Sequence, residues 1–173
     1  MNKLLLIAAS CLLLAGPASA QSVGEQTGVN STLGISPTTP DFVKEAAISD
    51  MFEIETSKLA VDRADGASKT FASQMVQDHT KTSTELKGMA PSNAPIPTAL
   101  DSSHQSKLDK LKGMNGGDFT KQYNDMQVTA HKEAVSLFER YGKGGDNEKL
   151  KAWANTTLPA LRHHLEMAQA MDK

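Results

Sequence analysis

Apolar residues recur every three or four positions along four long stretches of the sequence, which is the spacing of a helix with one buried face. The first stretch follows Thr38, a good helix-capping residue, and has Pro40 in its first turn. Gly88 stops the second stretch. The four predicted helices cover about residues 39–64, 68–87, 119–141 and 147–171.

A long connection joins the second and third predicted helices. It contains Pro91, Pro95 and Pro97, which exclude a regular helix or a central strand there. A short helix is predicted after Asp101, and it ends at the glycine-rich residues 113–117. An up-down-up-down bundle would need only a short loop at this point. The predicted fold class is therefore all-α: a four-helix bundle with a long crossover that carries a short extra helix, as in ferritin-like folds.

Residues 1–20 have the layout of a secretory signal peptide, with an early lysine, an apolar run from Leu4 to Leu14, and small residues before the expected cleavage at Ala20. The apolar run is too short to span a bilayer, so we expect no transmembrane span in the mature chain. Cleavage also removes Cys11, the only cysteine. The mature protein is predicted to be periplasmic or secreted, with a flexible polar leader over residues 21–38 and one bundle domain over residues 39–173.

The charge pattern and the missing motifs argue against several function classes. The formal net charge is -2 at pH 7, and no block of basic residues indicates a nucleic-acid partner. The sequence has no glycine-rich phosphate loop, no G-x-S-x-G nucleophile elbow and no H-E-x-x-H zinc motif. We therefore expect neither enzymatic activity nor nucleic-acid binding, while a protein partner remains compatible with the sequence.

Polar residues on the inward faces of the predicted helices are the candidates for chemistry. One hypothesis is that residues from several helices converge and hold a single transition-metal ion, such as iron, zinc or copper, through oxygen and imidazole ligands. The first, second and last helices supply Glu53, His79 and His164, and the third supplies a residue among Asp125, Gln127 and His131.

The helical rise predicts which of these residues lie at the same depth. Counting from the tight turn at Gly66 places Glu53 and His79 level with each other on facing helices. Counting from a second turn near residue 144 places His164 level with the turn from Asn124 to Gln127 rather than with His131.

A di-metal centre is not expected. Ferritin-like di-metal proteins carry Glu-x-x-His on two helices. The residues three positions before the three helical histidines are Val76, Val128 and Leu161, so the motif is missing.

The alternative is a structural polar core without metal. In that arrangement Glu53 and His79 form a buried hydrogen-bonded pair that sets the register of the first hairpin. Tyr123 and Gln127 complete the polar core, and His131 and His164 find partners in neighbouring hydroxyl groups or water.

Two adjacent histidines near the C-terminus face opposite ways in the predicted helix. His164 falls on the inward face, whereas His163 shares an outer stripe with Met167 and Met171. Thioether and imidazole groups at this spacing could bind Cu(I), although methionines at helical spacing are mostly core residues.

Three segments, FVKEAAISDMFEIETSKLA, FASQMVQDHTK and LPALRHHLEMAQ, resemble the bacterial secreted family known as domain of unknown function 4142. The likeness covers about residues 41–171 and includes the patterns QDH, QYxxxQxxxH and TLPxLxxH. The resemblance implies a ferritin-like bundle and no established activity. Members are often labelled outer membrane proteins, which implies an association with that membrane.

Two functional hypotheses follow. The first is an exported structural or interaction module of the cell envelope, linked to envelope stress and binding an unidentified protein. The second is a metal-binding protein that stores or senses iron, zinc or copper at a mononuclear site between the helices.

Overall fold

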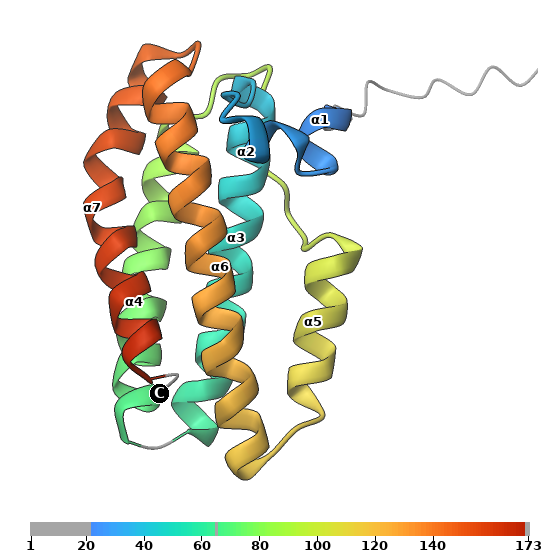
Figure 1. Cartoon of the computed structure of the whole chain (residues 1–173), viewed down its shortest axis with the longest axis vertical. Coiled ribbons are helices and arrows are strands. Elements are labelled where there is room, and N and C mark those ends of the chain that lie inside the picture. The colour runs from blue at the N-terminus through green and yellow to red at the C-terminus, as the bar shows by residue number, and fades with distance from the viewer. Residues whose placement is uncertain (1–21, 65, 172–173) are drawn as a thin grey trace, which may run out of the picture.

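The computed structural model describes residues 22–64 and 66–171, and the regular structure within these ranges is entirely helical. Four long helices form a bundle (Figure 1), which confirms the predicted all-α class. In the described residues the helices are α1 (Val23–Gln26), α2 (Val29–Leu33), α3 (Thr39–Arg63), α4 (Gly66–Met89), α5 (Ser102–Lys112), α6 (Gly116–Gly144) and α7 (Glu148–Met171).

The bundle consists of two antiparallel hairpins, α3 with α4 and α6 with α7. After α4 the chain crosses back along the bundle, and α5 lies on the outside against α3 and α6 (Figure 1). Because of this return, α6 runs parallel to α4. The predicted crossover with its short extra helix is confirmed.

Local sequence signals explain where α3 and α5 begin. The Thr38 hydroxyl accepts a hydrogen bond from the backbone N–H of Asp41, and the Asp101 carboxylate accepts one from His104 at 2.8 Å. Helix α6 is longer than predicted at both ends, because it begins at Gly116 and continues beyond Tyr141 to Gly144. The turn between α6 and α7 therefore lies at residues 145–147.

Two apolar clusters fill the bundle, and a polar layer separates them along each long helix. One cluster is built around Phe42, Tyr141 and Trp153, and the other around Phe71 and Phe119. Between the two clusters lie the buried polar side chains of Asp50, Glu53, Thr56, Ser57, His79, His131 and His164.

The described part of the predicted flexible leader, residues 22–38, contains the short helices α1 and α2, which its composition did not predict. The physical reason is a buried ion pair rather than apolar packing. Both Glu25 and Arg140 are buried, and the Arg140 guanidinium donates to both Glu25 carboxylate oxygens and to the backbone carbonyl of Ile35. Composition alone predicted disorder because the segment has few apolar residues.

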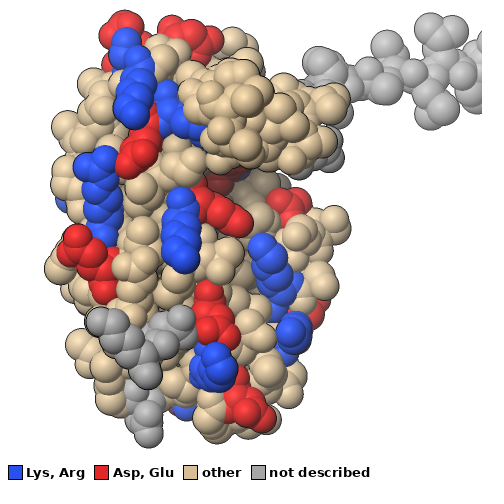
Figure 2. All heavy atoms as spheres, viewed as in Figure 1, with Lys and Arg blue, Asp and Glu red and all other residues tan. Residues whose placement is uncertain are grey.

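The predicted signal peptide, residues 1–20, lies outside the described residues. None of the described helices has the length and apolar character needed to cross a membrane. On the face shown in Figure 2, basic and acidic side chains lie intermixed over the bundle.

Candidate metal centre

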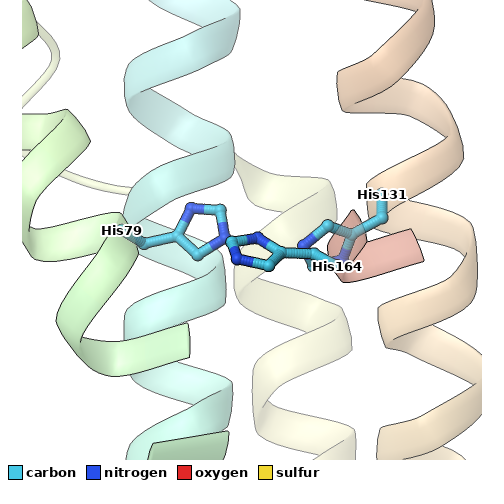
Figure 3. Close-up of side chains that lie close together, drawn as sticks. All are labelled: His79, His131 and His164. Carbon is cyan, nitrogen blue, oxygen red and sulfur yellow. The ribbon is translucent and has the colours of Figure 1, made fainter. Parts of the chain in front are cut away.

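Three histidines from three different helices meet in the polar layer. His79 of α4, His131 of α6 and His164 of α7 each offer a nitrogen, and these atoms all lie within 4.8 Å of one another. The rings converge in the middle of the bundle (Figure 3), with centroids 5.4 to 5.8 Å apart. The residues are only 2%, 1% and 5% exposed, so solvent does not satisfy their nitrogens.

The other nitrogen of each ring is held by an outer acceptor. His79 Nδ1 donates to Asp50 Oδ1 at 2.8 Å, His131 Nδ1 to the Gln127 carbonyl at 2.9 Å, and His164 Nε2 to Asp78 Oδ2 at 2.9 Å. A carbonyl or an ionised carboxylate can only accept, so each ring must carry its proton on this outer nitrogen.

The inner nitrogens of His131 and His164 are therefore lone-pair acceptors, and that of His79 is one whenever its ring is neutral. His79 Nε2, His131 Nε2 and His164 Nδ1 are all buried and have no hydrogen-bond partner. Metal-binding histidines have this arrangement, because the outer acceptor orients the ring and raises the basicity of the nitrogen that faces the metal.

Burial controls the charge of the cluster. It lowers the pKa of His131 to about 3, helped by the positive charge of His79, and it lowers the pKa of His164 for the same two reasons. Burial acts in the same direction on His79, but the hydrogen bond and negative charge of Asp50 outweigh it and raise the pKa of His79. His131 and His164 are thus neutral at pH 7, as metal coordination requires.

Glu53 lies in the same layer but does not form the predicted hydrogen bond with His79. Asp50, three residues earlier on the same face of α3, takes that position and also accepts from Thr82 and Ser83. His79, Thr82 and Ser83 of α4 all donate to Asp50, so the carboxylate that holds the His79 ring is at position 50 and not at position 53. Neither carboxylate oxygen of Glu53 has a hydrogen-bond partner, and burial raises its pKa to about 7.

The structure does not bring Asp125 to the cluster, which corrects that candidate ligand. Asp125 is partly exposed and pairs with Lys121 at 3.2 Å. It precedes the buried Gln127 by two residues, and this spacing places the two side chains on different faces of α6.

The other members of the predicted polar core are buried near the histidines. The Gln127 amide points to Thr56 at 3.5 Å, and the Tyr123 hydroxyl bonds to Ser57 at 3.0 Å. These contacts occupy Tyr123 and Gln127 on the α3 side of the layer.

His131 and His164 lie at the same level, so the prediction that His164 is level with Asn124 to Gln127 is wrong. Part of the error comes from the end of α6, because the helix continues to Gly144 and moves the turn to residues 145–147, which shifts the count from Asn124 to Val128. The predicted opposite facing of the adjacent histidines is confirmed, since His164 is buried and His163 is exposed.

Sequence reasoning missed the two carboxylates that hold the rings, Asp50 and Asp78. A signal existed for each. Residues 50 and 79 are almost equidistant from the turn between α3 and α4, and Asp78 directly precedes His79 in the QDH pattern. Neither carboxylate faces the centre directly, so a pattern of possible metal ligands does not include them.

Residues 24–171 match the family described as "Domain of unknown function (DUF4142)". The chain belongs to this family. The resemblance inferred from the sequence is thereby confirmed.

One similar solved structure is described as "CopM in the Cu(II)-bound form". It shares 14% sequence identity with a TM-score of 0.66, and the likeness covers 80% of this chain and 97% of that chain. At this identity the likeness shows a shared helical fold. A search of the curated proteins found no match.

Proposed function

We propose that the protein binds a single transition-metal ion, with copper as the preferred metal, through His79, His131 and His164. The observation that carries this proposal is the set of three buried, unpartnered nitrogens within 4.8 Å of one another. Leaving a buried acceptor unsatisfied costs about 1–3 kcal/mol. A bound metal ion would satisfy all three acceptors at once.

The geometry needs little adjustment to accept an ion. Imidazole nitrogens about 2.0–2.1 Å from a tetrahedral metal lie roughly 3.4 Å from each other. Small rotations of the rings would bring the three nitrogens to this spacing while their outer hydrogen bonds persist. One ion is proposed because the centre offers three imidazole donors and the chain lacks the Glu-x-x-His pairs of di-metal proteins.

The choice of copper has two supports. Imidazole ligands suit copper, zinc, iron and nickel, and copper binds most tightly among these divalent ions for a given nitrogen site. The solved structure that shares this fold is described as a Cu(II)-bound form. Zinc is the main competitor, because three imidazoles also suit a tetrahedral zinc ion.

The proposal places metal binding ahead of the structural or interaction module favoured by the sequence. A purely structural polar layer would leave the three inner nitrogens without donors, whereas the apolar clusters on both sides already supply a core. We further propose that the mature chain is exported and holds the metal in the cell envelope without catalysing a reaction, as the signal-peptide layout and missing catalytic motifs indicate.

The test is metal binding by the untagged mature protein and two matched variants. His131→Ala removes the most deeply buried ligand, and His163→Ala removes the exposed histidine beside His164. Metal content by mass spectrometry and competitive titration with Cu(II) and Zn(II) would be measured on folded protein. We expect about one ion per chain in the wild type and in His163→Ala, and at least about 100-fold weaker binding in His131→Ala.

Equal binding by folded His131→Ala and wild type would contradict the histidine centre. Loss of binding in His163→Ala would instead favour the outer stripe of His163, Met167 and Met171. A wild-type protein that folds and binds neither ion would favour the structural or interaction module.

A further inference from the structure

A cleft on the surface of the bundle leads to the histidine cluster. It lies between α4 and α7 and has a volume of about 310 Å³. His79 and His164 form part of its lining, together with Asp78 and Glu85 from α4. Two of the three inner ligands thus border a space that opens on solvent, whereas His131 lies behind them at 1% exposure.

The cleft exists because α4 and α7 pack less extensively than the helices within each hairpin. The residues that face each other across it are short, including Thr82 on one side and Thr157 and Ala160 on the other. Helix α7 also contains Pro159 beside Ala160, and proline removes one backbone hydrogen bond from a helix. This side of the bundle can therefore open with little loss of packing.

Acidic side chains stand between solvent and the histidines. The Asp78 side chain is 35% exposed and holds His164 Nε2, while the side chain of His164 is 6% exposed. The Glu85 side chain is 39% exposed and lies 3.9 Å from the ammonium group of Lys81, whose side chain is 76% exposed. Carboxylates in a cleft raise the local concentration of cations.

The wider cleft beside α5 does not offer such a route. It has a volume of about 720 Å³ and lies among α1, α2, α3, α5 and α6, where Figure 2 shows a hollow below the projecting N-terminal helices. Its lining contains none of the three clustered histidines and carries both acidic and basic residues, Lys44, Glu45, Lys107 and Glu133 among them.

We propose that a hydrated metal ion reaches the histidine centre through the cleft between α4 and α7, with Asp78 and Glu85 as its first protein contacts. This inference rests on the proposed metal-binding function. Asp78 connects the two stages, since the same carboxylate that meets the incoming ion also orients His164. The ion passes from these carboxylates to His79 and His164 and then to the innermost ligand, His131.

The experiment measures rates of metal uptake and release rather than affinity alone. Ala160→Trp places a large side chain at an exposed position on the cleft, and Ala152→Trp places the same side chain at an exposed position of α7 that does not line it. Stopped-flow mixing with Cu(II) or Zn(II), and with a chelator for release, gives both rate constants. We expect Ala160→Trp to slow both by roughly tenfold with an unchanged Kd, and Ala152→Trp to match the wild type.

A charge variant tests the route independently, because it introduces no large side chain that the fold must accommodate. Lys81→Glu should raise the uptake rate of the divalent ion by roughly two- to tenfold at low salt, and added salt should remove the gain. The release rate should change little because residue 81 touches neither the bound ion nor its ligands.

The outcomes separate the route from the site. Normal equilibrium binding with wild-type rates in Ala160→Trp would overturn the route and leave the proposed function standing. Equal slowing in Ala152→Trp and Ala160→Trp would also overturn it, because the effect would not depend on the cleft. A wild-type chain that binds neither metal ion would overturn the proposed function and the route together.

Discussion

Asp50 positions the centre at the scale of a single residue, because it joins α3 to the histidine of α4. Its carboxylate accepts from His79 at 2.8 Å, from the Thr82 hydroxyl at 2.9 Å and from the Ser83 hydroxyl at 3.2 Å. These three bonds fix the ring so that Nε2 faces the other two histidines. At the proposed metal centre Asp50 would therefore act through the orientation of His79, without touching the ion.

Asp50→Asn should weaken metal binding by about 10–100-fold, because the amide orients the imidazole poorly and lacks the negative charge. The metal-free variant should also lose about 1–3 kcal/mol of unfolding free energy from its disturbed hydrogen bonds. Metal titration and urea unfolding would measure both effects, with the exposed Asp62→Asn on the same helix as the control. Wild-type affinity in Asp50→Asn would show that the hydrogen bond from His79 Nδ1 to Asp50 does not affect metal binding.

Protonation of the buried histidines should make the metal-free fold sensitive to acid. His131 has a pKa of about 3 when folded and about 6.5 when unfolded, so the unfolded chain binds more protons as the pH falls between these values. This linkage removes on the order of 4 kcal/mol of stability from pH 6.5 to pH 3. His164 acts in the same direction, and the raised pKa of His79 lowers stability only as the pH rises above about 6.5.

Glu53 opposes this trend in part of the range. Its pKa is about 7 when folded, against 4.5 for an unperturbed glutamate, so the folded protein takes up a proton first and gains stability as the pH falls from 7 to 4.5. We expect a nearly flat wild-type profile in that window and a steep loss below it. Glu53→Gln should lose stability from about pH 6.5 downward, as measured by urea unfolding of metal-free protein. Parallel profiles for the two proteins would contradict this assignment.

Single helices were predictable where one local signal decided the structure. Thr38 and Asp101 mark helix starts because their side chains satisfy backbone N–H groups that the helix leaves free. The end of α6 and the helices α1 and α2 were not predictable in this way. They depend on contacts with residues far along the chain, such as the ion pair between Glu25 and Arg140, which a local pattern does not contain.

The ion pair between Glu25 and Arg140 should hold α1 and α2 on the bundle. Glu25→Ala leaves a buried guanidinium without its carboxylate and should cost about 3 kcal/mol of unfolding free energy. Glu55→Ala breaks an exposed pair with Lys58 and should cost less than about 1 kcal/mol. Chemical denaturation compares the two, and similar small losses would mean that the N-terminal helices contribute little to the fold.

For the whole molecule, the periodic pattern of apolar residues was enough to predict the bundle and its crossover, because burial of one helix face dominates such folds. The histidine cluster proposed as a metal centre was predictable only in part. His79 and His164 were named by their inward positions, but the choice of His131 over Asp125 depended on a register that a shift of one turn reverses. The three histidines come from three helices, so an error in the predicted end of one helix changes which residues are expected to meet.

The three clustered histidines belong to both hairpins, so a metal ion bound at the proposed centre would crosslink the entire bundle. His79 lies on α4, whereas His131 and His164 lie on α6 and α7, and the α4–α7 side is the loosely packed one.

Metal that binds only the folded state should raise the unfolding free energy by about 2.7 kcal/mol at a free concentration of 100 times Kd. Urea unfolding followed by circular dichroism and tryptophan fluorescence should show both signals shifting together, because Trp153 lies in the apolar cluster next to the polar layer. His131→Ala should abolish the shift. A metal-induced change confined to one signal, or an equal shift in His131→Ala, would place the ion outside the histidine cluster.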